Sequence, residues 1–87
     1  MTYTVEWSRR SGRQLAKLDP QVARSLVRFM HDRVHESADP RAIGKQLRDS
    51  AFWRYRVGDY RILCRIEDQR LVVLVVELGH RREIYRR

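Results

Sequence analysis

Arginine side chains recur along residues 52–67 of this chain, two positions apart at Arg54 and Arg56 and four positions apart at Arg61 and Arg65. In an extended strand, side chains alternate between the two faces, so residues two or four apart point the same way. Guanidinium groups gathered on one face repel one another, and each binds phosphate oxygens through a planar fork. The spacing therefore predicts a sheet with one apolar face and one basic face that binds an anion.

A second group of reactive side chains lies near the C-terminus, in the segment Gly79-His80-Arg81-Arg82-Glu83-Ile84-Tyr85. We expect Gly79 to let the chain turn, so that His80, Arg81 and Tyr85 reach the edge of the basic face. Histidine exchanges a proton near neutral pH. The two groups together suggest a surface that holds RNA and cuts it. The alternatives are a C-terminal packing role for His80 and Tyr85 and a merely solvated strand face for Arg54 and Arg56.

The charge of the whole chain supports a polyanionic partner. Nineteen Lys and Arg against eleven Asp and Glu give a net charge of +8 over 87 residues, and seventeen of the basic residues are arginine. The excess is concentrated in residues 41–87, which hold twelve basic and six acidic side chains. Such a balance is typical of proteins that bind nucleic acid. A solvated basic surface with no such partner is the alternative.

Several other classes of protein are disfavoured. The longest apolar run, residues 71–76, is far shorter than the roughly 20 residues that span a bilayer. The N-terminus has no apolar signal region, and the single Cys64 cannot form an internal disulfide. We expect a cytoplasmic protein without membrane contact or cofactor. His31 and His35 are four apart on a predicted helix, but nothing completes a metal site, and we expect both to be solvated.

The N-terminal half predicts a short strand and two helices. Residues 2–7 alternate as in a strand, and Ser8 can cap a helix over residues 9–18. Asp19 followed by Pro20 indicates a second helix start, and apolar residues at helical spacing extend it to about residue 36. That apolar stripe is core.

The C-terminal half predicts three strands. A connector over residues 41–50 leads to alternating strands at 52–57 and 60–67, joined by a tight turn at Gly58-Asp59. Residues 71–78 are apolar at nearly every position, which indicates a central strand covered on both faces, between the first strand and residues 60–67. The order β-α-α-β-β-β predicts one α+β domain over residues 1–87. Its two helices would pack on the face of a largely antiparallel sheet that bears Ile62, Cys64 and Ile66.

Three motifs give the chain a resemblance to a known family. They are K-x-L-R at residues 45–48, W-R-Y-R-V-G-D-Y-R-I at 53–62, and G-H-R-R-E-I-Y at 79–85. In this order, with a Val-rich strand before the last, they resemble the RelE/ParE superfamily of toxins from bacterial toxin–antitoxin pairs. The resemblance covers nearly the whole chain, and its C-terminal motif favours the RelE branch.

The resemblance implies a metal-free endoribonuclease that cleaves mRNA in the ribosomal A site. The family's active residues correspond to Arg54, Arg56, Arg61, Arg81 and Tyr85. The 2′-hydroxyl would attack the adjacent phosphate. Arg61 and Arg81 would bind that phosphate, Arg54 and Arg56 the flanking backbone, and Tyr85 would stack on a base or orient the hydroxyl. Further RNA contacts are expected from Lys45, Arg48, Arg65 and Arg82. The implied partners are mRNA, rRNA and a cognate antitoxin that is acidic or amphipathic.

One departure concerns the proton-transfer step. The best-known family pattern has lysine where this chain has Arg54 and Arg56, and arginine effectively never loses its proton. His80 is therefore predicted as the base or the acid. Two other activities remain open: a ParE-like inhibitor of DNA gyrase, and an inactive module that binds RNA or antitoxin.

Overall fold

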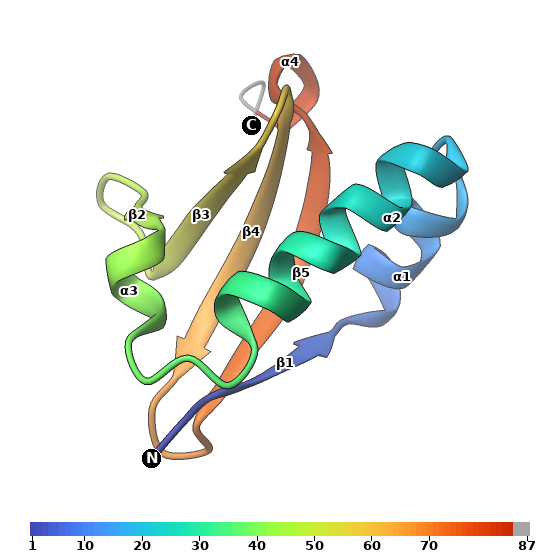
Figure 1. The fold of residues 1–87 in the computed structure, drawn as a ribbon. Coiled ribbons are helices and arrows are strands. Elements are labelled where there is room, and N and C mark those ends of the chain that lie inside the picture. Colours follow the sequence, from blue (N-terminus) through green and yellow to red (C-terminus); the bar gives the residue numbers. More distant parts are fainter. Residues whose placement is uncertain (85–87) are drawn as a thin grey trace.

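The protein is described by a computed structural model, which gives the backbone of residues 1–84 and the side chains of residues 1–82. Its centre is a five-stranded sheet in the order β1-β5-β4-β3-β2 (Figure 1). The strands are β1 (Thr4–Trp7), β2 (Lys45–Gln46), β3 (Phe52–Val57), β4 (Tyr60–Glu67) and β5 (Val72–His80). The pair β1 and β5 is parallel, and the other neighbouring pairs are antiparallel. The predicted α+β class and the position of β5 between β1 and β4 are confirmed.

The helices begin where the sequence predicts and end earlier. In α1 (Arg9–Ala16), the side chain of Ser8 accepts a hydrogen bond from the Ser11 amide, as expected of an N-cap. Helix α2 (Pro20–Phe29) is capped by Asp19. It continues as one π-helical turn, η1 (Met30–Val34), after which His35 has extended backbone. The predicted second helix therefore ends about two residues too late.

The connector is more structured than the sequence indicates. It contains a short helix, α3 (Pro40–Ile43), followed by β2, which pairs with β3 at the sheet edge. The sheet thus has five strands in place of the predicted four. Neither short element contains enough residues to display a periodic pattern of apolar side chains, so the pattern could not reveal them.

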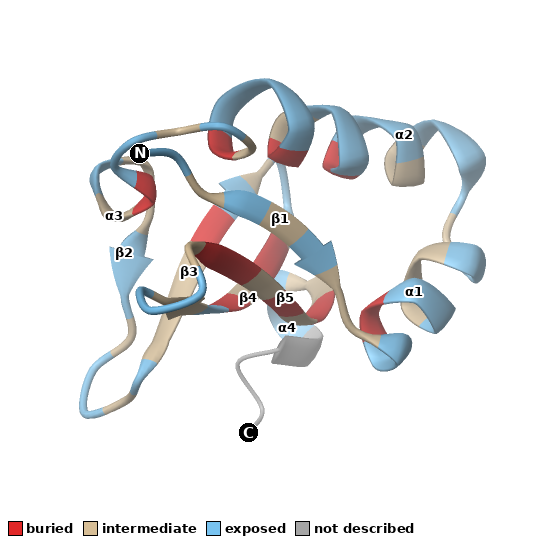
Figure 2. Cartoon of the chain, turned by 90° about the horizontal axis from the view of Figure 1, so that it is seen from below, coloured by how far each residue is buried: buried red, intermediate tan, exposed pale blue. Residues whose placement is uncertain are grey.

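The core lies between one face of the sheet and the helices α2 and η1 (Figure 2). Leu26, Met30 and Val34 pack there against residues of β3, β4 and β5: Tyr55, Ile62, Cys64, Val73, Val75 and Leu78. The Tyr55 hydroxyl donates a hydrogen bond of 2.8 Å to the Pro40 carbonyl. Burial raises the pKa of the Cys64 thiol. The predicted apolar face of β4 therefore is the core face.

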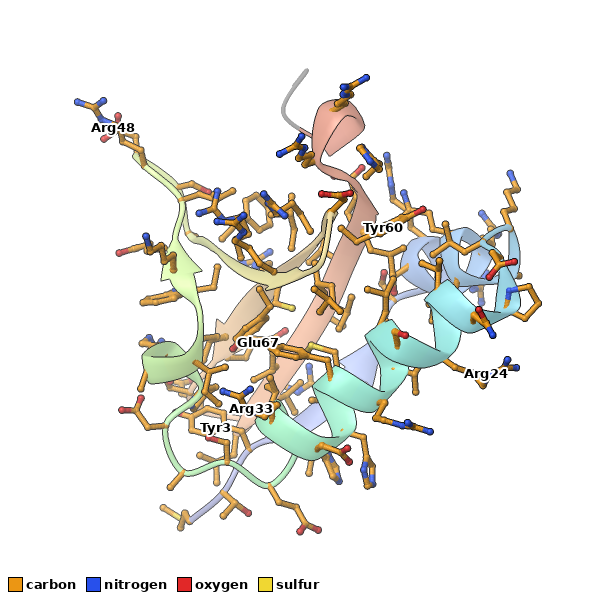
Figure 3. All side chains as sticks on the ribbon, turned by 45° about the horizontal axis from the view of Figure 1, so that its top comes forward. Tyr3, Arg24, Arg33, Arg48, Tyr60 and Glu67 are labelled. Atoms are coloured by element: carbon orange, nitrogen blue, oxygen red, sulfur yellow. The ribbon has the colours of Figure 1, made fainter. Side chains whose placement is uncertain are left out.

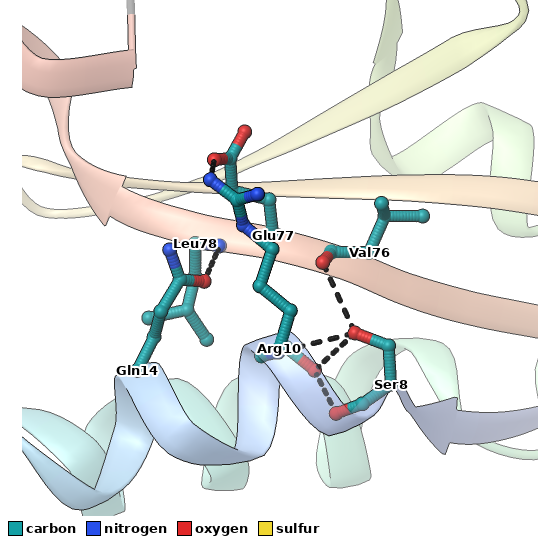
Figure 4. Close-up of polar contacts among 7 residues, drawn as sticks. Ser8, Arg10, Gln14, Val76, Glu77 and Leu78 are labelled. Atoms are coloured by element: carbon teal, nitrogen blue, oxygen red, sulfur yellow. Dashed lines mark hydrogen bonds and ion pairs between the residues drawn. The ribbon is translucent and has the colours of Figure 1, made fainter.

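Helix α1 lies along the edge of β5 where β1 has ended. The Ser8 Oγ donates to the Val76 carbonyl at 3.0 Å, and the Gln14 Oε1 accepts from the Leu78 amide at 2.8 Å (Figure 4). The Ser11 Oγ also donates to the Val75 carbonyl. These three side chains satisfy strand-edge groups that would otherwise need a further strand. The position of α1 relative to β5 is therefore fixed by hydrogen bonds as well as by packing.

The two histidines of the second helix have different environments. His31 is exposed, but His35 is partly buried, and its Nδ1 accepts a hydrogen bond of 3.1 Å from the Val5 amide. The rings stack with centroids 5.8 Å apart. The prediction that both are solvated is thus wrong for His35, which supports the outer edge of β1. In the described part of the chain, no group of three or more His, Cys, Asp or Glu side chains could hold a metal ion.

Candidate nucleic-acid interface

The sheet face opposite α2 carries the predicted cations in rows across the strands. Cross-strand partners share a face, so the pairing of Arg56 with Arg61, and of Arg61 with Gly79, defines the first row. The second row consists of Lys45, Arg54, Leu63 and Glu77, and the third of Phe52, Arg65 and Leu74. We call this surface the arginine face and define it by Lys45, Arg54, Arg56, Arg61 and Arg65.

The hairpin turn between β3 and β4 positions Arg61. Val57 pairs with Tyr60 across a two-residue turn in which Gly58 has a φ of 59°, a conformation that glycine adopts without strain. The Nη1 of Arg61 donates to the carbonyl oxygens of Gly58 at 3.3 Å and of Tyr60 at 3.2 Å. Arg61 is consequently only 4% exposed. We expected an open side chain, and the structure instead places its guanidinium against the turn.

The other basic side chains of the interface are more accessible. Arg56 and Arg65 are exposed, and Arg54 is partly buried. Lys45 is exposed on β2 beside Arg54. Arg48 lies at the tip of the loop after β2 and extends away from the sheet (Figure 3). Arg48 therefore lies apart from the arginines of the sheet, and its expected contact with RNA stays a prediction.

The segment after β5 returns to the same hairpin turn. The backbone amide of Arg81, the first residue of α4 (Arg81–Ile84), donates to the Asp59 carbonyl at 2.8 Å. Arg81 and Arg82 are both exposed. Gly79 does not form the expected turn, because it lies within β5 opposite Arg61. Tyr85, the last predicted catalytic residue, lies outside the described residues.

His80 is placed apart from the arginine face. It pairs with Tyr60, whose face is the one that packs on the core, and the two rings meet edge to face at 5.6 Å. The His80 Nδ1 accepts a hydrogen bond of 3.3 Å from the Arg82 amide, at the start of α4. This geometry suits a helix-capping residue. Proton transfer by His80 stays a prediction. The pairing of His80 with Tyr60 does not favour it, because it places His80 on the opposite face from the arginines.

Two charged residues at the interface were not singled out from the sequence. Glu77 lies on the arginine face and is 6% exposed, and it forms an ion pair of 2.6 Å with Arg10 of α1. Residues 71–78 are apolar at nearly every position, so their pattern shows no alternation and does not indicate which face Glu77 lies on. A charged residue inside that run was the available signal.

The chain matches known proteins over nearly its whole length. Residues 5–85 match a family model described as the ParE toxin of the type II toxin–antitoxin system parDE. The chain is also 36% identical over 89 residues to Toxin RelG of Mycobacterium tuberculosis, with all of both chains covered. The chain therefore belongs to the RelE/ParE family of type II toxin–antitoxin toxins, as its motifs predict.

Solved structures agree with this assignment. The chain resembles a chain of the toxin–antitoxin complex RelBE2 from Mycobacterium tuberculosis with a TM-score of 0.80 and 32% identity, over 92% of this chain and 99% of that one. It resembles a free Escherichia coli toxin RelE mutant with a TM-score of 0.75 and 24% identity, over 99% and 93% of the two chains. The second similarity concerns the fold alone. No helix in the described residues is long and apolar enough to span a membrane.

Proposed function

We propose that this toxin is a ribosome-dependent, metal-independent endoribonuclease that inhibits translation by cleaving mRNA in the ribosomal A site. One observation carries the proposal. The β3–β4 hairpin brings Arg54, Arg56 and Arg61 onto one face and also receives the backbone of Arg81. Three cationic side chains on one sheet face, with the backbone of Arg81 beside the same turn, are suited to bind a phosphate that gains charge during the reaction.

The resemblance to the family and the described positions together support the following roles. Arg61, fixed against the turn, and Arg81, exposed beside it, bind the scissile phosphate. Arg54 and Arg56 bind the flanking backbone, while Lys45, Arg48, Arg65 and Arg82 supply further contacts to mRNA and rRNA. Tyr85 stacks on a base or orients the 2′-hydroxyl. The 2′-oxygen loses its proton and attacks the adjacent phosphorus, the bond to the 5′-oxygen breaks, and that oxygen leaves with a proton, so the products carry a 2′,3′-cyclic phosphate and a 5′-hydroxyl.

The dependence on the ribosome has a physical reason. Arginine cannot act as a general base, because it keeps its proton at any ordinary pH. A site that offers mainly charge stabilisation gains most when the 2′-hydroxyl and the phosphate are already aligned, and the ribosomal A site aligns them. Free RNA is therefore cut poorly.

The partner that restrains the toxin is a cognate antitoxin. The similar mycobacterial chain comes from a toxin–antitoxin complex. For this chain, whose net charge is +8, an antitoxin with an acidic or amphipathic segment would cover the arginine face. Association should weaken as salt rises, and binding that is indifferent to salt contradicts this electrostatic mode.

A second candidate is inhibition of DNA gyrase, because the matching family model is described as a ParE toxin. The experiment that separates the two is induction of the toxin followed by primer extension on mRNA, with Arg81→Ala and Tyr85→Phe as comparisons. We expect new mRNA 5′ ends with the wild type and few with either variant. Intact mRNA together with DNA damage and a supercoiling defect supports the gyrase activity instead.

A further inference from the structure

A β-bulge turns Glu77 onto the arginine face. Leu63 pairs with Glu77, whereas the next residue of β4, Cys64, pairs with Val75, so β5 has one extra residue, Val76. If Val76 paired with Leu63 in a regular register, Glu77 would lie opposite Ile62 and would point into the core. Bulges re-aim side chains and are frequent beside functional sites. Here the bulge brings a carboxylate among the cations of the sheet.

Arg10 reaches this carboxylate from outside the sheet. Its Nη2 donates to the Glu77 Oε1 at 2.6 Å, and α1 is held beside β5 by the hydrogen bonds of Ser8 and Gln14 (Figure 4). The two side chains differ greatly in exposure, at 55% for Arg10 and 8% for Glu77. The carboxylate is therefore covered, while the guanidinium that it holds is open to solvent. A guanidinium has five N–H donors, so one that is held in this way can still bind a phosphate.

Stability alone is a weak explanation of this pair. An ion pair with one exposed partner contributes little to folding, and covering a carboxylate carries a desolvation cost. The position of the pair suggests a different purpose. Lys45 and Arg54 lie in the same row as Glu77, on the far side of β4. Neighbouring strands are about 4.8 Å apart. Cations therefore lie on both sides of β4, close enough together to contact one RNA segment.

We propose that Arg10 is an additional phosphate-binding residue of the arginine face and that Glu77 is the residue that positions it. The inference rests on the proposed function, in which this face binds RNA. An RNA strand that crosses the sheet contacts Arg54 and Arg56 over β3 and Arg10 at the edge of β5. Helix α1 thereby takes part in substrate binding.

The test is the affinity of the full-length toxin for a short, 2′-O-methylated single-stranded RNA, measured by fluorescence anisotropy over a series of salt concentrations. Arg10→Ala should weaken binding several-fold and reduce the slope of log affinity against log salt by about 0.7, the value for one phosphate contact on a single strand. Arg13→Ala is the matched control, because Arg13 is exposed on the same helix and its loss changes the net charge equally. Equal effects of the two variants overturn the inference.

The positioning role of Glu77 is tested in two backgrounds. Glu77→Gln keeps the cation of Arg10 but weakens the contact that holds it. The substitution should therefore lower RNA affinity when Arg10 is present and have little further effect in a protein that already carries Arg10→Ala. Equal losses in both backgrounds overturn the positioning role. If Glu77→Gln does not fold, Arg10→Lys replaces it. Lysine keeps the charge but not the planar fork, and we expect it to restore only part of the affinity. Full affinity in this variant contradicts a requirement for a fixed guanidinium.

Two further variants separate this inference from the proposed function. Arg54→Ala and Arg56→Ala should each weaken RNA binding. If they do so while Arg10→Ala behaves like Arg13→Ala, the inference about Arg10 alone fails. If neither affects binding, the arginine face is not the RNA surface and the proposed function fails with it.

Discussion

Arg61 and Arg81 are held by adjacent carbonyl groups of one hairpin turn. The Arg61 side chain donates to the Gly58 carbonyl, and the Arg81 backbone amide donates to the Asp59 carbonyl. Residues twenty positions apart in the sequence are thereby fixed around the same two-residue turn. The hairpin is thus a structural support of the proposed phosphate site as well as a connection between β3 and β4.

Arg61→Ala should lower the rate of ribosome-dependent mRNA cleavage by about 100-fold or more, the usual cost of removing one preorganised donor to a transition-state anion. Arg65→Ala is the matched control, because Arg65 is exposed on the same strand and face but lies two rows further from the turn. Single-turnover cleavage on programmed ribosomes measures both rates. Similar losses in the two variants would show that only the total charge matters.

Substitution of His80 separates helix capping from proton transfer. Asparagine is a strong helix N-cap but cannot act as a general acid or base at neutral pH. Because the His80 Nδ1 accepts the Arg82 amide, we predict that His80→Asn retains most of the cleavage activity, whereas His80→Ala loses more of it. The measurement is the pH–rate profile of both variants. A loss of about 100-fold or more in His80→Asn, with disappearance of a titration limb, would establish His80 as a proton-transfer residue.

Gly44 is a position where the backbone passes close to a core side chain. A Cβ at residue 44 would lie 2.8 Å from the Tyr55 ring and 2.9 Å from the Arg54 carbonyl oxygen. Gly44→Ala should therefore lower the free energy of unfolding by about 1–3 kcal/mol. In Gly12→Ala the new Cβ meets nothing within 4 Å, and α1 should gain about 0.5–1 kcal/mol. Urea denaturation measures both, and equal stabilities contradict the packing seen around Tyr55.

The buried thiol predicts a loss of stability in alkali. Burial raises the pKa of Cys64 in the folded state, so its stabilising effect is complete below the unfolded-state pKa of about 8.5 and is lost as the pH rises above it. Burial also raises the pKa of Tyr55, which adds a second loss above about pH 10. The free energy of unfolding should fall by up to about 1.4 kcal/mol per pH unit for each proton involved.

Cys64→Ala tests the first of these losses. The variant should be less stable than the wild type at neutral pH, because it leaves a small cavity, but its stability should change little between about pH 8.5 and 10. Denaturant midpoints measured at a series of pH values give the comparison. An unchanged alkaline slope in the variant would mean that another group causes the loss.

The sequence predicted β3 and β4 in detail because their residues alternate. Arg54 and Arg56 between Trp53 and Tyr55 can face only one way if the aromatic rings are to reach the core. The same alternation assigned Arg61 and Arg65 to the opposite face from Ile62, as the register confirms. What alternation could not show was that Arg61 folds back onto the turn.

The sequence could not predict which side chains of β5 point to the core and which to the arginine face, for two physical reasons. A strand that is apolar at nearly every position does not indicate which side chains face the core. The bulge at Val76 then shifts the pairing by one residue, which places Glu77 with the cations and His80 with Tyr60. The proposed role of Arg10 depends on that bulge and on the hydrogen bonds of α1 to the strand edge, and the sequence reveals neither.

The most direct test of the proposed activity is a reconstituted translation reaction in which purified toxin is added and mRNA 5′ ends are mapped with and without ribosomes. We predict cleavage at codons in the ribosomal A site, little cleavage of the same mRNA without ribosomes, and loss of cleavage in Arg61→Ala. Intact mRNA in the presence of ribosomes, together with inhibition of purified gyrase by the same preparation, would contradict the endoribonuclease function.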